Sequence, residues 1–327
     1  MLQDSFNRTI NNLRISVTDR CNFRCLYCMP EEGMIWLKRD ELLTFEEIER
    51  LARIFSDLGV VKIRLTGGEP LMRKDFPLLV KKISNLNLFH DIALTTNGYF
   101  LEEQAQALQD AGLHRITVSL DSLDPLKFSA MARRDYFQKV WKGLEFIDQL
   151  NFHPIKLNTV MIRGYNDNEI DAFAELARRR NFIVRFIEFM PIGADDGWSI
   201  DKVVPAREII EHLNRTGVTL VPIESHGIQP ADRFKFEDGK GEIGFISSVS
   251  DPFCGSCNRV RITSDGKFRT CLFSLNETDL KALLRNGADD NEIKSAIRDA
   301  VFHKEKGHLI NQPGFVRAER TMSQIGG

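Results

Sequence analysis

Apolar positions follow two different spacings between residue 13 and about residue 190. Short runs rich in β-branched residues have the length of buried strands, and we expect strands at 13–18, 61–66, 91–96, 115–120, 155–160 and 183–189. Between them, apolar residues recur at helical spacing near 44–58, 75–88, 101–111, 124–150 and 167–180. Strands joined by helical crossovers predict an α/β protein with a parallel sheet, either doubly wound or curled into a barrel.

The pattern changes in the last third of the chain. A helix is expected at 205–216, short antiparallel strands within 234–273, and helix again over 276–303. We therefore expect a first domain over residues 1–195 and a C-terminal extension over residues 196–327.

Polar and glycine motifs follow the predicted strands. Thr-Asp-Arg-Cys comes after the first strand at 18–21, Thr-Gly-Gly-Glu-Pro after the second at 66–70, and Thr-Thr-Asn-Gly after the third at 95–98. Ser-Leu-Asp-Ser closes the fourth strand at 119–122, and Glu-Phe-Met-Pro ends the sixth at 188–191. In both kinds of parallel sheet, ligands bind at the carboxyl ends of the strands, so we expect the site there.

Composition excludes some classes of function. Hydrophobic residues make up 43% and charged residues 28% of the chain, as in ordinary globular proteins. The formal net charge is −2, so no bulk field would recruit nucleic acid or a membrane, and a polyanionic substrate would need a local cluster of Arg and Lys. No stretch resembles a signal peptide or a membrane span. The cysteines are therefore expected in the reducing cytoplasm, where metal ligation is favoured over disulfides.

All six cysteines belong to two groups with the close spacing of metal ligands. The first trio has C-x3-C-x2-C spacing and the second trio C-x2-C-x13-C spacing, and their members are Cys21, Cys25 and Cys28, and Cys254, Cys257 and Cys271. A structural zinc site needs four Cys or His ligands, and each trio lacks a fourth one nearby. Three thiolates suit a [4Fe–4S] cluster with one iron open to a non-protein ligand. Zinc, and a redox role for the Cys-x-x-Cys pair, remain alternatives.

The first trio carries a resemblance. Cys-Asn-Phe-Arg-Cys-Leu-Tyr-Cys at 21–28 resembles the signature of the radical S-adenosylmethionine (SAM) superfamily, and Gly-Gly-Glu-Pro at 67–70 is similar to its second motif. The resemblance implies a partial (β/α)6 TIM-like barrel and a [4Fe–4S] cluster whose open iron chelates SAM, so that reduction releases a 5′-deoxyadenosyl radical. The residues that it places at the SAM site are Tyr27, Gly68, Ser119 and Met190.

The second trio narrows the resemblance. The segment PFCGSCNRVRITSDGKFRTCLFS at 252–274 and the terminal SQIGG are similar to the GTP 3′,8-cyclases that begin molybdenum cofactor biosynthesis. This likeness implies a radical SAM lyase that converts GTP to (8S)-3′,8-cyclo-7,8-dihydroguanosine 5′-triphosphate. It implies a second [4Fe–4S] cluster in the C-terminal extension, which binds the purine. It also implies an external electron donor and a separate cyclic pyranopterin synthase downstream, and it leaves room for a homodimer.

Basic residues at strand positions fit a triphosphate. Arg259 and Arg261 stand two apart in one predicted strand, so both side chains point to one face, and arginine can bind phosphate with paired hydrogen bonds. Together with the resemblance, the residues expected to contact GTP are Arg14, Arg64, Thr95, Lys156, Arg185, Arg259, Arg261, Gly326 and Gly327. Glu69, Asn97 and Asp121 are expected to support the site from behind. No acid or base catalyst is assigned, because the radical comes from SAM.

Two other functions stay open on the sequence alone. A radical SAM enzyme that modifies a peptide should carry more cysteines in its C-terminal half than the three present here. An iron–sulfur redox sensor or carrier would need both trios, but neither the Gly-Gly-Glu-Pro motif nor the ring of arginines.

Overall fold

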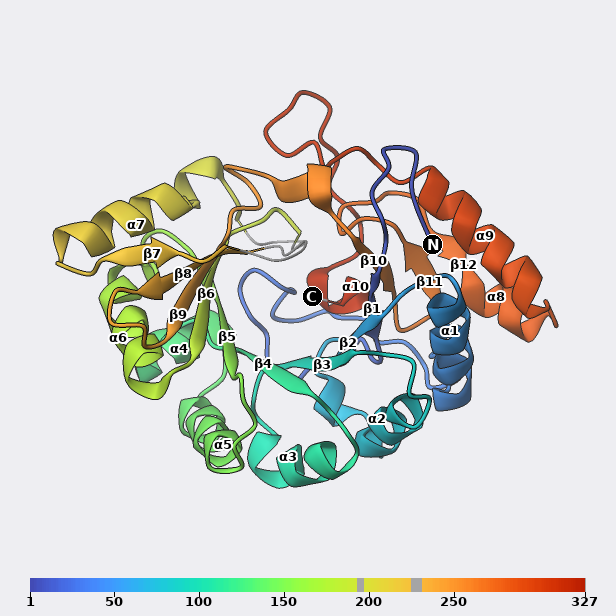
Figure 1. Ribbon diagram of the computed structural model, residues 1–327, viewed down its shortest axis with the longest axis horizontal. Helices are drawn as coiled ribbons and strands as arrows, with labels where there is room; N and C mark the ends of the chain where they lie inside the picture. Colours follow the sequence, from blue (N-terminus) through green and yellow to red (C-terminus); the bar gives the residue numbers. More distant parts are fainter. Residues whose placement is uncertain (193–196, 225–230, 327) are drawn as a thin grey trace.

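The computed structural model describes residues 1–192, 197–224 and 231–326. Within them, twelve strands form one sheet in the order β12-β11-β10-β1-β2-β3-β4-β5-β6-β9-β8-β7. The sheet curves around the centre of the molecule, and helices cover its outer side (Figure 1). The architecture is thus the partial barrel that the radical SAM resemblance implied.

The strands predicted in the first domain are all present and run parallel to one another. Their bounds are β1 (Asn12–Ser16), β2 (Lys62–Thr66), β3 (Asp91–Thr96), β4 (Arg115–Ser119), β5 (Lys156–Met161) and β6 (Ile183–Glu188). In β1, Leu13 and Ile15 are fully buried in the hydrophobic core, whereas Arg14 between them lines a cavity. Because side chains alternate along a strand, one face of the sheet packs against helices and the other can carry polar side chains.

Helices pack on the apolar outer face of these strands. They are α1 (Phe45–Asp57), α2 (Phe76–Ser84), α3 (Leu101–Asp110), α4 (Pro125–Ala132), α5 (Phe137–Gln149) and α6 (Ile170–Arg180). A capping box formed by Thr44 and Glu47 begins α1. The single helical stretch expected at 124–150 is two helices, because Arg133 ends α4 in the left-handed conformation, at φ 52°.

The C-terminal extension contributes strands to both sides of the parallel barrel sheet. Strand β9 (Glu242–Ile246) pairs with β6 in parallel, and β10 (Arg259–Ile262) pairs with β1 in parallel, so these segments extend the sheet at both edges. The pairings further out are antiparallel. On one side β9 pairs with β8 (Asp232–Phe236), which pairs with β7 (Leu220–Pro222). On the other side β10 pairs with β11 (Lys267–Arg269), which pairs with β12 (Thr278–Asp279). The predicted antiparallel pairs are thus present, as β8 with β9 and β10 with β11, but the parallel pairings with β6 and β1 were not predicted, because residue spacing within a strand does not reveal all of its partners.

The extension and the first domain share one hydrophobic core. Phe268 of β11 packs against Phe55 of α1, with ring centroids 5.5 Å apart. The helices of the extension are α7 (Ala206–Arg215), α8 (Leu280–Arg285), α9 (Asp290–Phe302) and α10 (Met322–Ile325). The expected boundary between 195 and 196 lies within residues 193–196, outside the described residues, and stays a prediction.

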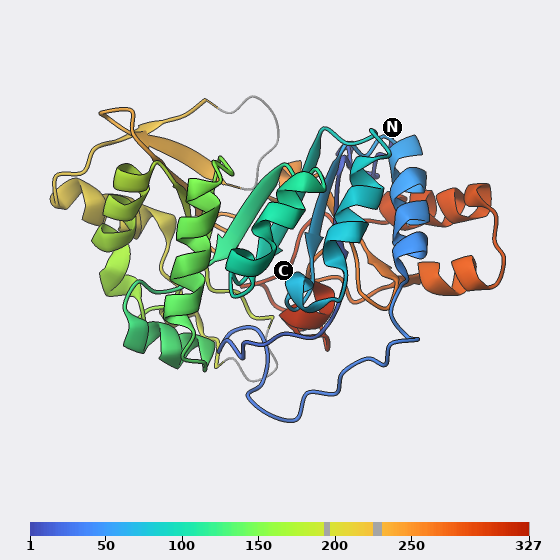
Figure 2. The same ribbon diagram turned by 90° about the horizontal axis from the view of Figure 1, so that it is seen from below.

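Two further features of the fold bear on the site. The long segment between β1 and α1 lies at the same end of the molecule as α10 (Figure 2). No helix in the described part of the chain is long and apolar enough to cross a membrane.

Candidate functional site

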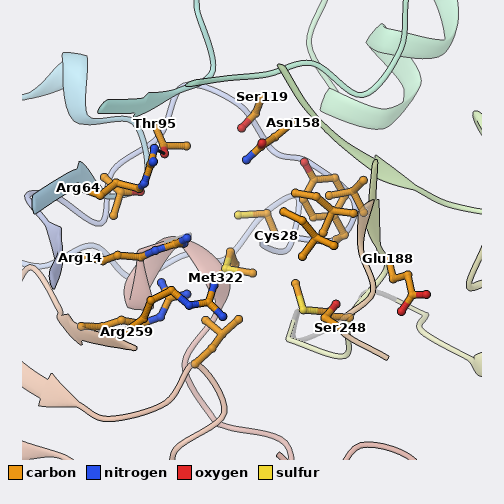
Figure 3. Close-up of a pocket in the computed structure, with 18 of the residues that line it drawn as sticks. Arg14, Cys28, Arg64, Thr95, Ser119, Asn158, Glu188, Ser248, Arg259 and Met322 are labelled. Atoms are coloured by element: carbon orange, nitrogen blue, oxygen red, sulfur yellow. Dashed lines mark hydrogen bonds between the residues drawn. The ribbon is translucent and has the colours of Figure 1, made fainter. Parts of the chain in front are cut away.

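A cavity of about 260 Å³ opens on the inner side of the curved sheet. All the parallel strands, from β10 at one edge to β9 at the other, contribute side chains to its wall, and both cysteine trios line it. Arg14, Arg64 and Arg259 lie on one side of this cavity, and Ser119 and Asn158 lie on another (Figure 3). The structure therefore gathers residues that are far apart in the sequence into one site.

The two trios lie at opposite ends of the parallel strands. The first trio follows the carboxyl end of β1. Asn12, at the amino end of β1, pairs with Arg259, which comes just after Cys257 of the second trio. The prediction placed the whole site at the carboxyl ends of the strands. The cavity continues to their amino ends, because β10 runs parallel to β1 and Cys257 lies just before the start of β10.

The loop of the first trio is fixed by backbone hydrogen bonds. The N–H groups of Arg24 and Leu26 donate to carbonyls in the last turn of α4, each at 3.0 Å, and the Cys28 N–H donates to the Cys25 carbonyl at 2.9 Å. All three cysteines are free thiols. Burial and neighbouring negative groups raise the pKa of Cys25 and Cys28, and raise that of Cys21 to about 12. Thiolates here need a bound cation to compensate them, which fits an iron–sulfur cluster.

Gly67 and Gly68 let two backbone segments touch. The Gly68 N–H donates to the Thr18 carbonyl, and the Glu69 N–H to the Arg20 carbonyl, both at 2.7 Å. A Cβ atom on Gly68 would lie 2.4 Å from the Arg20 carbonyl oxygen, far inside van der Waals contact. The missing side chain therefore holds the loop that leads into the first trio against the end of β2.

Glu69 organises the segments around this loop. Its buried carboxylate accepts hydrogen bonds from the Leu71 N–H at 2.9 Å, the Thr96 hydroxyl at 2.8 Å and the Asn97 N–H at 2.7 Å. Burial raises the pKa of Glu69 to about 7. The Asn97 side-chain amide in turn points to Cys21 Sγ, at 3.8 Å. The support from behind that the sequence suggested for Glu69 and Asn97 is thus compatible with their contacts.

Asp121 fixes the aromatic ring within the first trio. The Tyr27 hydroxyl donates to Asp121 Oδ2 at 2.7 Å, and the Val160 N–H donates to Oδ1 at 2.9 Å. Burial raises the pKa of Asp121 to about 6. Because both carboxylate oxygens are engaged, the Tyr27 ring is held as one wall of the cavity.

Five arginines give the cavity a strongly positive side. Arg261, Arg14 and Arg64 lie at the same level on three adjacent strands, since Arg14 pairs with both of the others. Burial and the neighbouring guanidinium groups lower the pKa of Arg14, and lower that of Arg261 and of Arg185 to about 9. Arg259 also lines the wall, with its guanidinium over an aromatic ring. Like charges brought together under partial burial favour a bound polyanion.

The second trio flanks the hairpin of β10 and β11. Cys254 lies in the 3-10 turn η4 (Phe253–Ser256), and the Cys257 N–H donates to the Cys254 carbonyl at 3.1 Å. Burial raises the pKa of Cys257, but the charges of Arg259 and Lys304 outweigh it and bring the pKa to about 7. Cys271, directly after β11, has its pKa raised by burial.

Three predicted substrate residues are not part of the described wall. Lys156 is buried at the first residue of β5, where burial and the charge of Arg185 lower its pKa to about 6. Gly326 lies against the ends of β1 and β2, and Arg261 donates a hydrogen bond to its carbonyl. Gly327 lies outside the described residues. The other predicted site residues all line the cavity.

The structure adds wall residues that sequence reasoning missed. Asn158 Oδ1 and Ser248 Oγ are buried and have no hydrogen-bond partner among the described residues. Buried polar groups are normally paired, so both atoms fit contacts with a bound polar ligand. Asn158 lies two positions after Lys156 in β5, so both side chains point to the same face of the strand, and this alternation could have predicted Asn158. Ser248 had no such signal, because it follows a strand whose parallel pairing was not expected.

Comparisons with known proteins agree with this site. The family model "Radical SAM superfamily" matches residues 15–177, and the model "Molybdenum Cofactor Synthesis C" matches residues 182–310. The chain is 46% identical to the GTP 3′,8-cyclase of Pelotomaculum thermopropionicum, over 100% of both chains. It is also 46% identical to the GTP 3′,8-cyclase of Syntrophomonas wolfei, over 99% of both chains.

A solved structure shows the same fold at low identity. SuiB of Streptococcus suis, in its crystal structure bound to S-adenosylmethionine, superposes with a TM-score of 0.65 at 14% identity, covering 95% of this chain and 77% of SuiB. Fold, first trio and family model together define a radical SAM enzyme, a class that implies SAM and one [4Fe–4S] cluster. The full-length relatives go further: the chain belongs to the family of GTP 3′,8-cyclases.

Substitution of Gly68 tests the contact behind the first trio. Gly68→Ala should push the two backbone segments apart, because its Cβ would lie 2.4 Å from a carbonyl oxygen. We expect SAM affinity to fall at least about tenfold, which corresponds to about 1.4 kcal/mol. Gly255→Ala is the matched control, since a Cβ there meets nothing within 4 Å. Equilibrium SAM binding and iron content check both variants, and normal SAM affinity in Gly68→Ala would contradict this account.

Proposed function

We propose that the chain converts GTP to (8S)-3′,8-cyclo-7,8-dihydroguanosine 5′-triphosphate, the first step of molybdenum cofactor biosynthesis. The observation that carries the proposal is that two cysteine trios and five arginines meet on one cavity. Radical generation at the first trio requires neither the second trio nor the arginines. A peptide substrate has no triphosphate for the arginines to bind, and a redox carrier has no need of the cavity.

At the first trio, Cys21, Cys25 and Cys28 would hold the cluster that the superfamily implies. When bound, the cluster and SAM supply a 5′-deoxyadenosyl radical that takes hydrogen from C3′ of GTP. The chain's own part is positioning: the residues proposed to line SAM are Tyr27, Gly68, Ser119 and Met190. Tyr27 is held by Asp121, and the Gly68 backbone by the segment before the trio, so the wall is ordered before the ligands arrive.

At the second trio, we propose a second [4Fe–4S] cluster on Cys254, Cys257 and Cys271, with the purine at its open iron. Three free thiols on one cavity wall support this ligation. The nearby cations Arg259 and Lys304 favour the thiolate form that a metal ligand needs.

The triphosphate would lie among the arginines. The residues proposed to bind GTP are Arg14, Arg64, Thr95, Lys156, Arg185, Arg259, Arg261, Gly326 and Gly327. Arg64 already donates to the Thr95 hydroxyl at 3.1 Å, which keeps the two side chains together at the cavity. Arg14 Nε is buried and has no hydrogen-bond partner within the described residues, so it has a donor to offer a phosphate.

The remaining assignments follow from the family and stay proposals. An external donor supplies the electron, and a cyclic pyranopterin synthase takes the product. The enzyme is proposed to work in the cytoplasm and to bind neither nucleic acid nor membranes. A homodimer is a further proposal. The chain divides, on this view, into a barrel over 1–195 and an extension over 196–327 whose tail closes the barrel mouth.

Metal content and products test the function directly. Protein reconstituted without oxygen should bind about two [4Fe–4S] clusters, or about eight irons per chain. With a reductant, SAM and GTP, chromatography should show 5′-deoxyadenosine and a cyclised nucleotide. Cys25→Ser should abolish both products, whereas Cys257→Ser should keep 5′-deoxyadenosine and lose the cyclised nucleotide. Stoichiometric zinc with little iron, or no cyclised nucleotide from the wild-type protein, would remove the proposal.

Lys156 should couple GTP binding to a proton. Its pKa in the free protein is about 6, so the amine is largely neutral near pH 7. A bound triphosphate raises this pKa, and between the two values the complex then carries a proton that the free protein lacks. GTP affinity should therefore fall as pH rises above about 6. Calorimetry in buffers of different ionisation enthalpy measures the proton uptake.

The matched variants separate Lys156 from the titration of GTP itself. Lys156→Met should lose the proton uptake, and Lys142→Met, at an exposed position on α5, should retain it. Equal uptake in all three proteins would show that Lys156 does not sense the nucleotide.

Deletion of Gly326 and Gly327 tests the tail. The carbonyl of Gly326 accepts a hydrogen bond from Arg261, and a backbone group of Ser323 bonds to the Cys28 thiol, so the tail touches both sides of the cavity. The truncated protein should keep its fold, both clusters and SAM cleavage, because the tail ligates no metal. Cyclised nucleotide should be nearly absent, because hydrogen abstraction depends on near-attack geometry. Wild-type yields of both products, measured side by side, would show a dispensable chain end.

A further inference from the structure

Lys304 is a buried cation beside the second trio. It follows α9 and is only 2% exposed. Its ammonium donates to the Arg259 carbonyl at 3.2 Å and to the Thr270 carbonyl. Within the described residues, its hydrogen bonds thus go to backbone oxygens and none goes to a carboxylate. A buried ammonium without a carboxylate partner is costly, so its position calls for a reason.

The two carbonyls belong to the segments that carry the cysteines. Arg259 comes two residues after Cys257, and Thr270 directly precedes Cys271. The ladder between β10 and β11 ends at the pair Arg261–Arg269, before it reaches these residues. Lys304 therefore joins the two segments, close to Cys257 and Cys271, where strand pairing no longer does.

Of the basic residues around the second trio, Arg8 has a carboxylate partner, whereas the hydrogen bonds of Lys304 go to carbonyls. Arg8 is neutralised by a buried ion pair with Asp4, at 2.6 Å, and its other N–H groups donate to carbonyls that include Cys254. Glu305 accepts a hydrogen bond from the Thr270 hydroxyl at 2.7 Å. Lys304 donates to the Arg259 and Thr270 carbonyls, so its positive charge lies beside both cysteine segments without a carboxylate hydrogen-bond partner among the described residues.

We propose that Lys304 is a positioning residue that holds the segments of Cys257 and Cys271 together and supplies the countercharge for a cluster bound there. The inference rests on the second cluster of the proposed function. A [4Fe–4S] cluster on three thiolates is negatively charged, and one electron from an external reductant makes it more so. A buried cation stabilises the more negative state more strongly, so Lys304 raises the reduction potential of this cluster.

The test measures that potential without interference from the first cluster. In the full-length chain, Cys21, Cys25 and Cys28 are all replaced by Ala, so that only the second trio can hold iron. Lys304→Met removes the charge at similar length, and Lys304→Arg retains it. Lys306→Met removes an exposed charge two residues away and serves as the surface control. A potentiometric titration followed by electron paramagnetic resonance gives the midpoint, with iron content and apo-protein Tm as accompanying readouts.

Lys304→Met should make the cluster harder to reduce, by about tenfold in the reduction equilibrium constant, which is about 59 mV for one electron. Lys304→Arg should shift it by less than half as much, and Lys306→Met should leave it unchanged. Loss of the cluster from Lys304→Met alone, with unchanged apo-protein Tm, would also support the charge role. An unchanged midpoint in Lys304→Met, or equal shifts or cluster loss in both Lys304 variants, would overturn the inference. A parent chain without any cluster would instead overturn the proposed second cluster itself.

Discussion

The site depends on the parallel pairing of β10 with β1. This pairing places Arg261 beside Arg14 and Arg259 beside Asn12, so it fixes both the row of arginines and the position of the second trio. A shift of this register by one residue would move every side chain of β10 to the opposite face of the sheet. The hairpin partner β11 anchors the register from outside, because Phe268 is buried against α1. Packing on the outer face therefore determines which charges face the cavity.

The inner face of the sheet carries an excess of positive charge, although the net charge of the whole chain is slightly negative. The net charge of the chain is −2, yet five arginines line one cavity, where burial and neighbouring guanidinium groups lower the pKa of Arg14, Arg185 and Arg261. The carboxylates close to the wall are occupied elsewhere: Glu188 accepts from the backbone of Val249 and Ser250, and Asp121 holds Tyr27. Among the described residues, these carboxylates do not pair with the arginines, so the positive side of the cavity suits a polyanion.

Local pattern was enough to predict most elements but not their partners. The six strands of the first domain and the capping box at Thr44 depend on residues close in sequence, and both were confirmed. The antiparallel pairs formed by β9 and β10 were expected, but their parallel pairing with β6 and β1 was not, because nothing within so short a run shows which strands lie on both sides of it. Cysteine spacing, strand position and motif resemblance located the cysteines, the arginines and the predicted SAM-site residues of the wall. Asn158 and Ser248 escaped notice because their significance, a buried polar atom without a partner, exists only once the chain is folded.

The two halves of the site lie toward opposite ends of the same parallel strands. The first trio follows the carboxyl end of β1, whereas Cys254 and Cys257 of the second trio precede β10, whose first residue pairs with the amino end of β1. Four residue steps along β1 span about 13 Å, at about 3.3 Å per residue. Both trios nevertheless line the same cavity, an arrangement that suits a ligand with several distinct parts, such as a nucleotide. On the proposed function, the arginine row at mid-strand would hold the triphosphate while the purine and the ribose face different trios. Lys304 contacts only the segments of the second trio among the described residues, so on the proposed function it would act on that trio alone.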